Sequence, residues 1–285
     1  MSTTSTRPAA HARRVVDVHD ARVFKDTPSH LAKVVIEPNA WAEHDPFLIM
    51  AEDRFGGGAF DLHPHRGIET ITYVIDGRLD HQDNRGNTGS LGPRDVQLMT
   101  AGRGIIHNEV PPEGTMVHTL QLWLNLPATQ KLTEPRYQDL LHAAMPRISR
   151  NGAVVTVYSG SFDGTMANTL NHTPFTLLEM DAPAESHIDV PLPGSYNGFV
   201  HVIDGEGEVG VDGTSAKPGQ TLWLERTEAG IDTSVRISTQ THLRVLVAAG
   251  EPLRETVVAR GPFVMNTAEQ IKEAYADLRA GCFKA

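Results

Sequence analysis

The sequence predicts an all-β protein that folds as two β-barrels in tandem, with short helices between strands and a helix at the C-terminus. Short runs with strand-like alternation dominate the chain, and Gly, Pro and Asp turns separate them. At 285 residues the chain is long for one core and comfortable for two domains. Nine such runs are predicted strands: Leu31–Glu37, Ile68–Ile75, Val96–Met99, Val117–Leu124, Val154–Ser159, Phe175–Met180, Phe199–Val202, Thr221–Leu224 and Leu243–Ala248.

A weak internal repeat in the sequence supports a duplicated barrel. The stretch FVHVIDGEGEV (199–209) repeats the shape of ITYVIDGRLDH (71–81), and KPGQTLWL (217–224) echoes GPRDVQLM (92–99). Each pairing is a strand, a turn and a return strand. We therefore expect a first barrel over residues 1–130 and a second over residues 151–258.

The segment between the barrels is predicted to be a linker over residues 131–150 with a short helix. It is polar from Lys131 to Ala144 and carries Pro135. Within it, four residues follow a helical spacing: Tyr137, Leu140, Leu141 and Ala144.

The last segment, residues 259–285, is predicted to be a helical tail. Thr267 with Gln270 three residues later forms a capping-box pattern, which marks a helix N-terminus. Apolar residues then follow on one face, from Ile271 to Leu278, before Gly281. The tail is therefore an amphipathic helix of about 3 turns, and its apolar face must cover another part of the protein.

Two clusters of histidine and glutamate predict one mononuclear metal site. His63 and His65 are two residues apart, and so are His107 and Glu109, about forty residues later. Side chains two apart on a strand share a face, so each pair points the same way. If the two strands are neighbours in a barrel, three imidazoles and one carboxylate converge, and coordination positions remain for water or substrate. This nitrogen-rich ligand set suits iron, manganese, nickel, copper, cobalt or zinc better than calcium or magnesium.

The chain resembles the pirins, a branch of the cupin superfamily. The resemblance lies in HPHRGIETITYVIDG (63–77), MTAGRGIIHNEV (99–110), LQLWLNLP (120–127) and GPFVMNT (261–267), and it spans most of the chain. It implies two cupin, jelly-roll-like barrels, with one divalent metal ion, usually Fe(2+), held in the N-terminal barrel by His63, His65, His107 and Glu109. It also implies that the tail packs back on the N-terminal half.

The sequence departs from the general cupin pattern at Glu69. Many cupins carry a glutamate ligand after the His-x-His pair, but Glu69 does not hold the usual ligand spacing, so we expect it to face elsewhere and Glu109 to supply the carboxylate. The second barrel has His187 and Asp189, but nothing after Leu224 matches the His-x-Glu pair. We therefore predict that the second barrel holds no metal.

Composition argues against several classes of partner. A net charge of −10 and a pI near 5.7 disfavour direct nucleic-acid binding, which needs a basic face. The single cysteine, Cys282, permits no internal disulfide and no sulfur-based metal site. The N-terminus has no apolar stretch typical of a signal peptide, and no run of about 20 apolar residues occurs. These patterns predict a cytoplasmic protein without a membrane segment.

The resemblance implies a metal-dependent dioxygenase of the quercetin 2,3-dioxygenase type, an oxidoreductase whose partners are an aromatic small molecule such as a flavonol and O2. Glu109 is the expected catalytic residue, because a carboxylate beside the metal can take the proton of a substrate hydroxyl. The alternative is a non-enzymatic regulator that binds a transcription factor or metabolic enzyme in response to metal or redox state. A metal-free binding module is a third class, which the paired ligand clusters disfavour.

Overall fold

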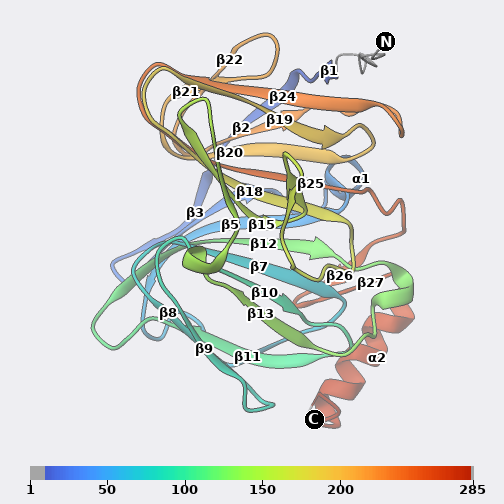
Figure 1. The fold of residues 1–285 in the computed structure, drawn as a ribbon. Coiled ribbons are helices and arrows are strands. Elements are labelled where there is room, and N and C mark those ends of the chain that lie inside the picture. Colours follow the sequence, from blue (N-terminus) through green and yellow to red (C-terminus); the bar gives the residue numbers. More distant parts are fainter. Residues whose placement is uncertain (1–9, 284–285) are drawn as a thin grey trace.

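The structure, a computed structural model, describes residues 10–283 and consists of two β-barrels stacked one on the other (Figure 1). The predicted all-β class with two β-barrels in tandem is confirmed. All nine predicted strands are present, within a few residues of their predicted ends. No helix among residues 10–283 has the length and apolar character needed to cross a membrane.

The first barrel consists of a seven-stranded sheet and a four-stranded sheet. In sheet order, the larger one contains β13 (Arg136–Leu140), β10 (Val96–Thr100), β7 (Ile68–Asp76), β12 (Met116–Asn125), β5 (Phe47–Gly56), β4 (His30–Ile36) and β3 (Arg22–Thr27). The smaller one contains β6 (His63–His65), β11 (Ile105–Val110), β8 (Leu79–Asp83) and β9 (Thr88–Leu91).

The second barrel repeats this plan with a seven-stranded and a five-stranded sheet. The larger one contains β14 (Arg147–Arg150), β15 (Ala153–Ser159), β18 (Phe175–Ala182), β25 (Leu243–Gly250), β20 (Asn197–Gly205), β23 (Gln220–Leu224) and β2 (Val15–Asp20). The smaller one contains β1 (His11–Ala12), β24 (Asp232–Thr239), β21 (Gly207–Val209) and β22 (Thr214–Ala216), with β19 (Ser186–Pro193) paired to β24.

Short elements complete the described chain. The helices are α1 (Trp41–His44), η1 (Ala128–Gln130), η2 (His142–Ala144) and α2 (Ala268–Arg279). Two hairpins join β16 (Ser161–Phe162) to β17 (Thr165–Met166) and β26 (Val258–Arg260) to β27 (Phe263–Met265). The predicted capping box is present at the start of α2, where Thr267 and Gln270 bond each other's backbone reciprocally.

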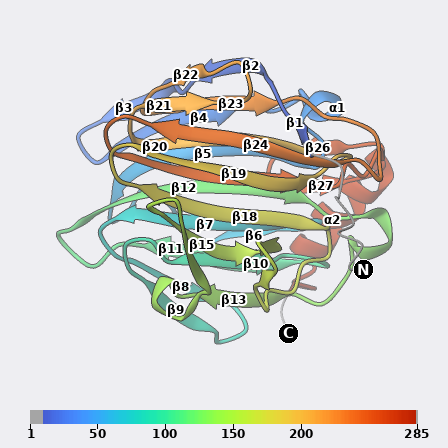
Figure 2. The same ribbon diagram turned by 45° about the horizontal axis from the view of Figure 1, so that its top comes forward.

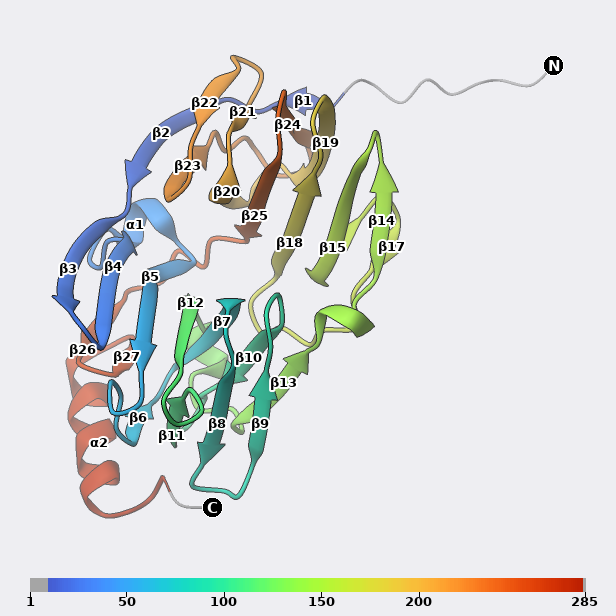
Figure 3. The ribbon, with the colours of Figure 1, turned by 90° about the vertical axis from the view of Figure 1, so that its left-hand side faces the viewer.

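The two seven-stranded sheets pack against each other, and this contact holds the barrels together (Figure 3). One buried cluster joins residues of both sheets, among them Phe47, Tyr73, Phe199 and Leu246. Because side chains alternate along a strand, β7 sends Ile71 and Tyr73 into this interface and its other face into the first barrel. The interior of the first barrel is therefore lined by a separate set of residues.

The structure differs from the predicted domain organisation in two places. Strands β1 and β2 pair with β24 and β23 of the second barrel, although they lie within the predicted first domain, residues 1–130 (Figure 2). In the predicted linker, residues 136–140 form strand β13 and extend the first sheet beside β10, so only His142–Ala144 is helical. The helical spacing of the linker was misleading because pairing with β10 decided its conformation. The other predicted domain limits stay predictions.

Candidate metal centre

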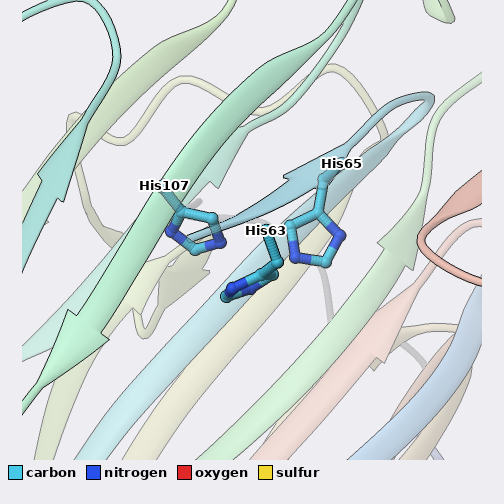
Figure 4. A group of neighbouring side chains, drawn as sticks. All are labelled: His63, His65 and His107. Carbon is cyan, nitrogen blue, oxygen red and sulfur yellow. The ribbon is translucent and has the colours of Figure 1, made fainter. Parts of the chain in front are cut away.

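Strands β6 and β11 bring the predicted metal ligands together. The two strands are antiparallel neighbours, and His107 lies directly opposite His63 while Ile105 lies opposite His65. Residues two apart on each strand share a face, so His63, His65 and His107 all point into the first barrel (Figure 4). The sequence predicted that residues two apart on neighbouring strands would place these histidines on one face, and the pairing of β6 with β11 does so.

The three imidazoles form a compact triad. One ring nitrogen from each lies within 4.8 Å of those of the other two. The ring centroids of His63 and His107 are 4.4 Å apart, and those of His63 and His65 are 4.9 Å apart. His63 directs Nδ1 toward the carbonyl of Asp61 at 2.8 Å, so Nδ1 carries the proton and Nε2 is available as a ligand.

The surroundings of the triad favour neutral imidazoles. Burial, together with smaller effects of nearby His63 and His81, lowers the pKa of His107 to about 3. Burial, followed by the neighbouring His107 and His63, also holds the pKa of His65 well below its usual value. Both nitrogens of His65 and of His107 are buried and have no hydrogen-bond partner in the described chain. Neutral, buried nitrogens without partners fit a divalent metal ion, because they offer lone pairs that no protein group satisfies.

Glu109 is close to the triad but is not part of the compact group. Its side chain is buried, and its two oxygens accept hydrogen bonds from Thr72 Oγ1 at 3.1 Å and from Gln121 Nε2 at 2.8 Å. These bonds hold the carboxylate on the wall of the same cavity that His63 lines. The structure therefore brings the three predicted histidines together and puts Glu109 beside them, and the role of all four as ligands stays a prediction.

His63 of the triad lines a cavity of about 340 Å³ inside the first barrel. This volume lies at the low end of the range for small-molecule sites. Eight of the lining residues are apolar or aromatic, and the other eight are polar or charged. The lining residues are Phe24, Lys25, His30, Ile49, Ala51, Asp53, Phe55, Ala59, Phe60, His63, Thr72, Leu79, Glu109, Thr119, Gln121 and Trp123.

Sequence reasoning missed the polar part of the opposite wall, which consists of Lys25, His30 and Asp53. A signal was present in β5, where Asp53 follows Ile49 and Ala51 on the inward face. A carboxylate at an otherwise apolar inward position is unusual and suggests a partner or a ligand. The partner, His30, comes from a different strand, and only the fold reveals it.

The C-terminal tail packs against the outside of this site, as the resemblance implied. Val264 N donates to Arg66 O, and Arg66 and Phe263 form a bridge, so the tail pairs beside His65. The Arg66 guanidinium lies over the Phe283 ring at 4.6 Å and pairs with Asp277 at 2.9 Å. Ile106, next to His107, packs against the same apolar cluster of the tail. The tail thus contacts the neighbours of two histidines of the triad.

Other residues that the sequence singled out lie away from the cavity. Glu69 is fully buried and accepts a hydrogen bond from Thr100 Oγ1 at 2.7 Å. It shares its face of β7 with Ile71 and Tyr73, which lie in the interface between the two sheets, so the prediction that it faces elsewhere is confirmed. In the second barrel, Asp189 pairs with Arg236, and His187 is exposed. That this barrel holds no metal stays a prediction.

Comparison with known proteins identifies the relatives of the chain. Residues 28–124 match the family model described as Pirin, and residues 177–284 match the Pirin C-terminal cupin domain. A "Pirin-like protein" of Solanum lycopersicum is 35% identical over 99% of this chain and 95% of its own length. A protein of Pseudomonas aeruginosa named "Putative quercetin 2,3-dioxygenase" is 38% identical over 94% of this chain and 97% of its own.

A solved structure shows the same fold. The crystal structure of quercetin 2,3-dioxygenase from Acinetobacter baumannii superposes with a TM-score of 0.83 and covers 96% of this chain and 99% of that one. The sequence identity is 24%, so this likeness concerns the arrangement of the barrels and leaves the chemistry of the site to the residues themselves.

Proposed function

The chain belongs to the pirin family of cupin proteins, and we propose that it is a metal-dependent dioxygenase that cleaves flavonols such as quercetin with O2. The observation that carries the proposal is the triad of His63, His65 and His107 at a cavity with aromatic walls. The name of the Pseudomonas aeruginosa relative supports the substrate class.

We assign four ligands to one divalent metal ion: His63, His65, His107 and Glu109. Three imidazoles and a carboxylate favour a first-row transition metal, and we propose Fe(2+), while manganese, nickel, cobalt, copper and zinc also suit the donor set. The support is that the ring nitrogens of His65 and His107 are buried without hydrogen-bond partners in the described chain, and that Glu109 lines the same cavity as His63. The ion would supply Lewis-acid polarisation of a substrate oxygen and a place for reaction with O2.

The protein groups orient the substrate and move its proton. Glu109, fixed by Thr72 and Gln121, is placed to take the proton of a substrate hydroxyl. Trp123 donates from Nε1 to Gln121 Oε1 at 3.2 Å and packs edge-on against His65, so its ring is held in the cavity wall. A fixed aromatic wall favours a flat ligand. In the proposed cleavage both atoms of O2 enter the product and carbon monoxide leaves.

Anaerobic reconstitution with each divalent metal, followed by oxygen uptake and carbon monoxide release with quercetin, tests the proposal. Glu109→Gln should lower kcat by about 100-fold or more, because it removes the proton acceptor. Glu69→Gln is the matched control, since Glu69 is a buried carboxylate of the same barrel outside the cavity lining, and it should leave kcat unchanged. Absence of oxygen uptake with every metal, while the metal stays bound, would refute the dioxygenase proposal.

A regulator is the second candidate, and the edge strand β3 favours it. β3 is the last strand of its sheet, and Val23 and Phe24 on it are 49% and 55% exposed. An exposed apolar edge is a surface that a protein partner can cover. A pull-down with the Fe(2+) and Fe(3+) forms decides between the classes. A stoichiometric partner that depends on oxidation state, without turnover of quercetin, favours the regulator.

A further inference from the structure

The wall opposite the metal triad carries three hydrogen-bonded polar side chains from three adjacent strands: Lys25 on β3, His30 on β4 and Asp53 on β5. Lys25 Nζ lies 2.9 Å from His30 Nδ1, and His30 Nε2 lies 2.7 Å from Asp53 Oδ1. An ammonium group only donates, so Nδ1 of His30 accepts and Nε2 donates to Asp53. The lysine thus fixes the tautomer of the histidine, and the histidine fixes the carboxylate.

Burial of the Asp53 carboxylate at this position costs free energy. It is only 8% exposed, and it shares the cavity with a second carboxylate, Glu109. Burial raises the pKa of Asp53, while the hydrogen bond from His30 opposes this shift and nearby Glu109 adds to it. An apolar residue here would pack on Phe55 and Phe60 without these costs. The cost is offset if a ligand supplies a hydrogen-bond donor to the carboxylate.

Asp53 has acceptor capacity left for such a donor. Its Oδ1 is occupied by His30, and within residues 10–283 we find no hydrogen bond to Oδ2. Ile49, Phe55 and Phe60 in the surrounding wall offer contact area but no donor, and no hydrogen bond to Asp53 is found from Thr119, which lies opposite it on β12. A ligand group that donates a hydrogen bond would therefore complete this wall.

We propose that Asp53, held by His30 and Lys25, binds a hydroxyl group at the end of the substrate remote from the metal triad. The substrate class is then an aromatic molecule with hydroxyl groups at both ends, one set directed to the histidines and Glu109 and the other to Asp53. A cationic group is disfavoured there because the ammonium of Lys25 lines the same wall. The inference rests on the proposed function for the end of the substrate that faces the metal.

A binding experiment tests this without turnover. The protein is loaded with Zn(2+), which has no redox chemistry, and titrated with quercetin and with the same flavonol lacking the hydroxyls of its remote ring. We expect the wild type to bind quercetin about tenfold more tightly than the analogue, as one hydrogen bond to a charged acceptor would give. Asp53→Asn should reduce this ratio to below about threefold.

Glu52→Gln is the matched control. Glu52 precedes Asp53 on β5, points to the opposite face of the sheet, and pairs with Lys33 and His118 outside the cavity lining. Glu52→Gln removes a buried ion pair without changing the cavity wall, so it controls for loss of stability. Its preference for quercetin over the analogue should equal that of the wild type.

The outcomes separate this inference from the proposed function. An unchanged ratio in Asp53→Asn, the absence of a preference in the wild type, or failure of both flavonols to bind each overturns the role of Asp53. If the preference depends on Asp53 while the iron-loaded protein consumes no O2 with quercetin, the dioxygenase proposal fails and the hydroxyl-binding role stands.

Discussion

Phe283→Ala should weaken metal binding although Phe283 does not touch the histidines. Its ring is 1% exposed and lies under the guanidinium of Arg66, the residue that follows His65. The Phe283 carbonyl also accepts a hydrogen bond from Asn84 Nδ2 at 2.7 Å, and Asn84 in turn bonds the backbone of Ile106, the residue before His107. Phe283 therefore anchors the tail to both strands that carry the triad.

The expected magnitude follows from the burial of the ring. Truncation of a fully buried phenylalanine to alanine costs about 3–5 kcal/mol, and the stacked guanidinium adds about 0.5–1 kcal/mol. Because the tail can separate locally, this cost raises the population of detached tail by a factor of roughly 400 to 25,000. Arg66 and Ile106 then lose their support, and the loss of such outer contacts lowers metal affinity by about 10–100-fold.

Competition with a chelator, followed by metal analysis of the protein, measures the affinity. Phe162→Ala is the matched control because Phe162 is 2% exposed in the core of the second barrel. It should lower the free energy of unfolding by a similar amount and leave the metal affinity unchanged. Equal metal affinities of Phe283→Ala and the wild type, with the tail detached by hydrogen exchange, would contradict the anchoring role.

Three further predictions concern stability. Burial raises the pKa of Glu52, but hydrogen bonds from His118 and Lys33 outweigh this effect and bring the pKa to about 2. Glu52→Gln should therefore lower the free energy of unfolding by about 3 kcal/mol at pH 7, and denaturant titrations should show the stabilities of wild type and variant converging as pH falls from about 4.5 to 2. Burial raises the pKa of Glu69 to about 7, so this carboxylate destabilises the folded state as pH rises from about 4.5 through 7. Glu69→Gln should raise the free energy of unfolding by about 3 kcal/mol at pH 8 and leave it unchanged at pH 4, and an equal increase at both pH values would refute this prediction. At Gly67, where φ is +80°, a Cβ would lie 2.0 Å from the carbonyl oxygen of Val264 in the tail. Gly67→Ala should therefore lower the free energy of unfolding in urea by at least about 2 kcal/mol, and an unchanged unfolding midpoint would show that the tail can move away at no cost.

The strands could be predicted because each carries a local alternating pattern that burial then enforces. The segment 136–140 was misread since Tyr137, Leu140 and Leu141 suit both a helical spacing and a short strand. What decided between them was pairing of the segment with β10, a contact about 40 residues away in sequence that local patterns do not record.

The histidines of the site could be predicted for the same reason, and the opposite wall could not. His63 and His65 form one local pattern, and His107 and Glu109 form another, so parity alone put each pair on one face. His30 and Asp53 are 23 residues apart on different strands, and neither lies in a recognisable motif. A single acidic residue among apolar positions on the inward face of β5 was the only signal, and it does not identify its partner.

The position of β6 explains why the proposed metal centre would need the tail. β6 has three residues and lies at the edge of its sheet, so β11 is its one neighbour in that sheet. So few ladder hydrogen bonds cannot by themselves fix His63 and His65 to the tolerance that metal ligation requires. Pairing of the tail with Arg66 continues the strand on its other side and shields the exposed edge. His63 and His65, the two proposed ligands on β6, are thus positioned by residues about 200 positions away in the chain. Removal of the tail should loosen this pair before it affects His107, which belongs to a longer strand with two neighbours.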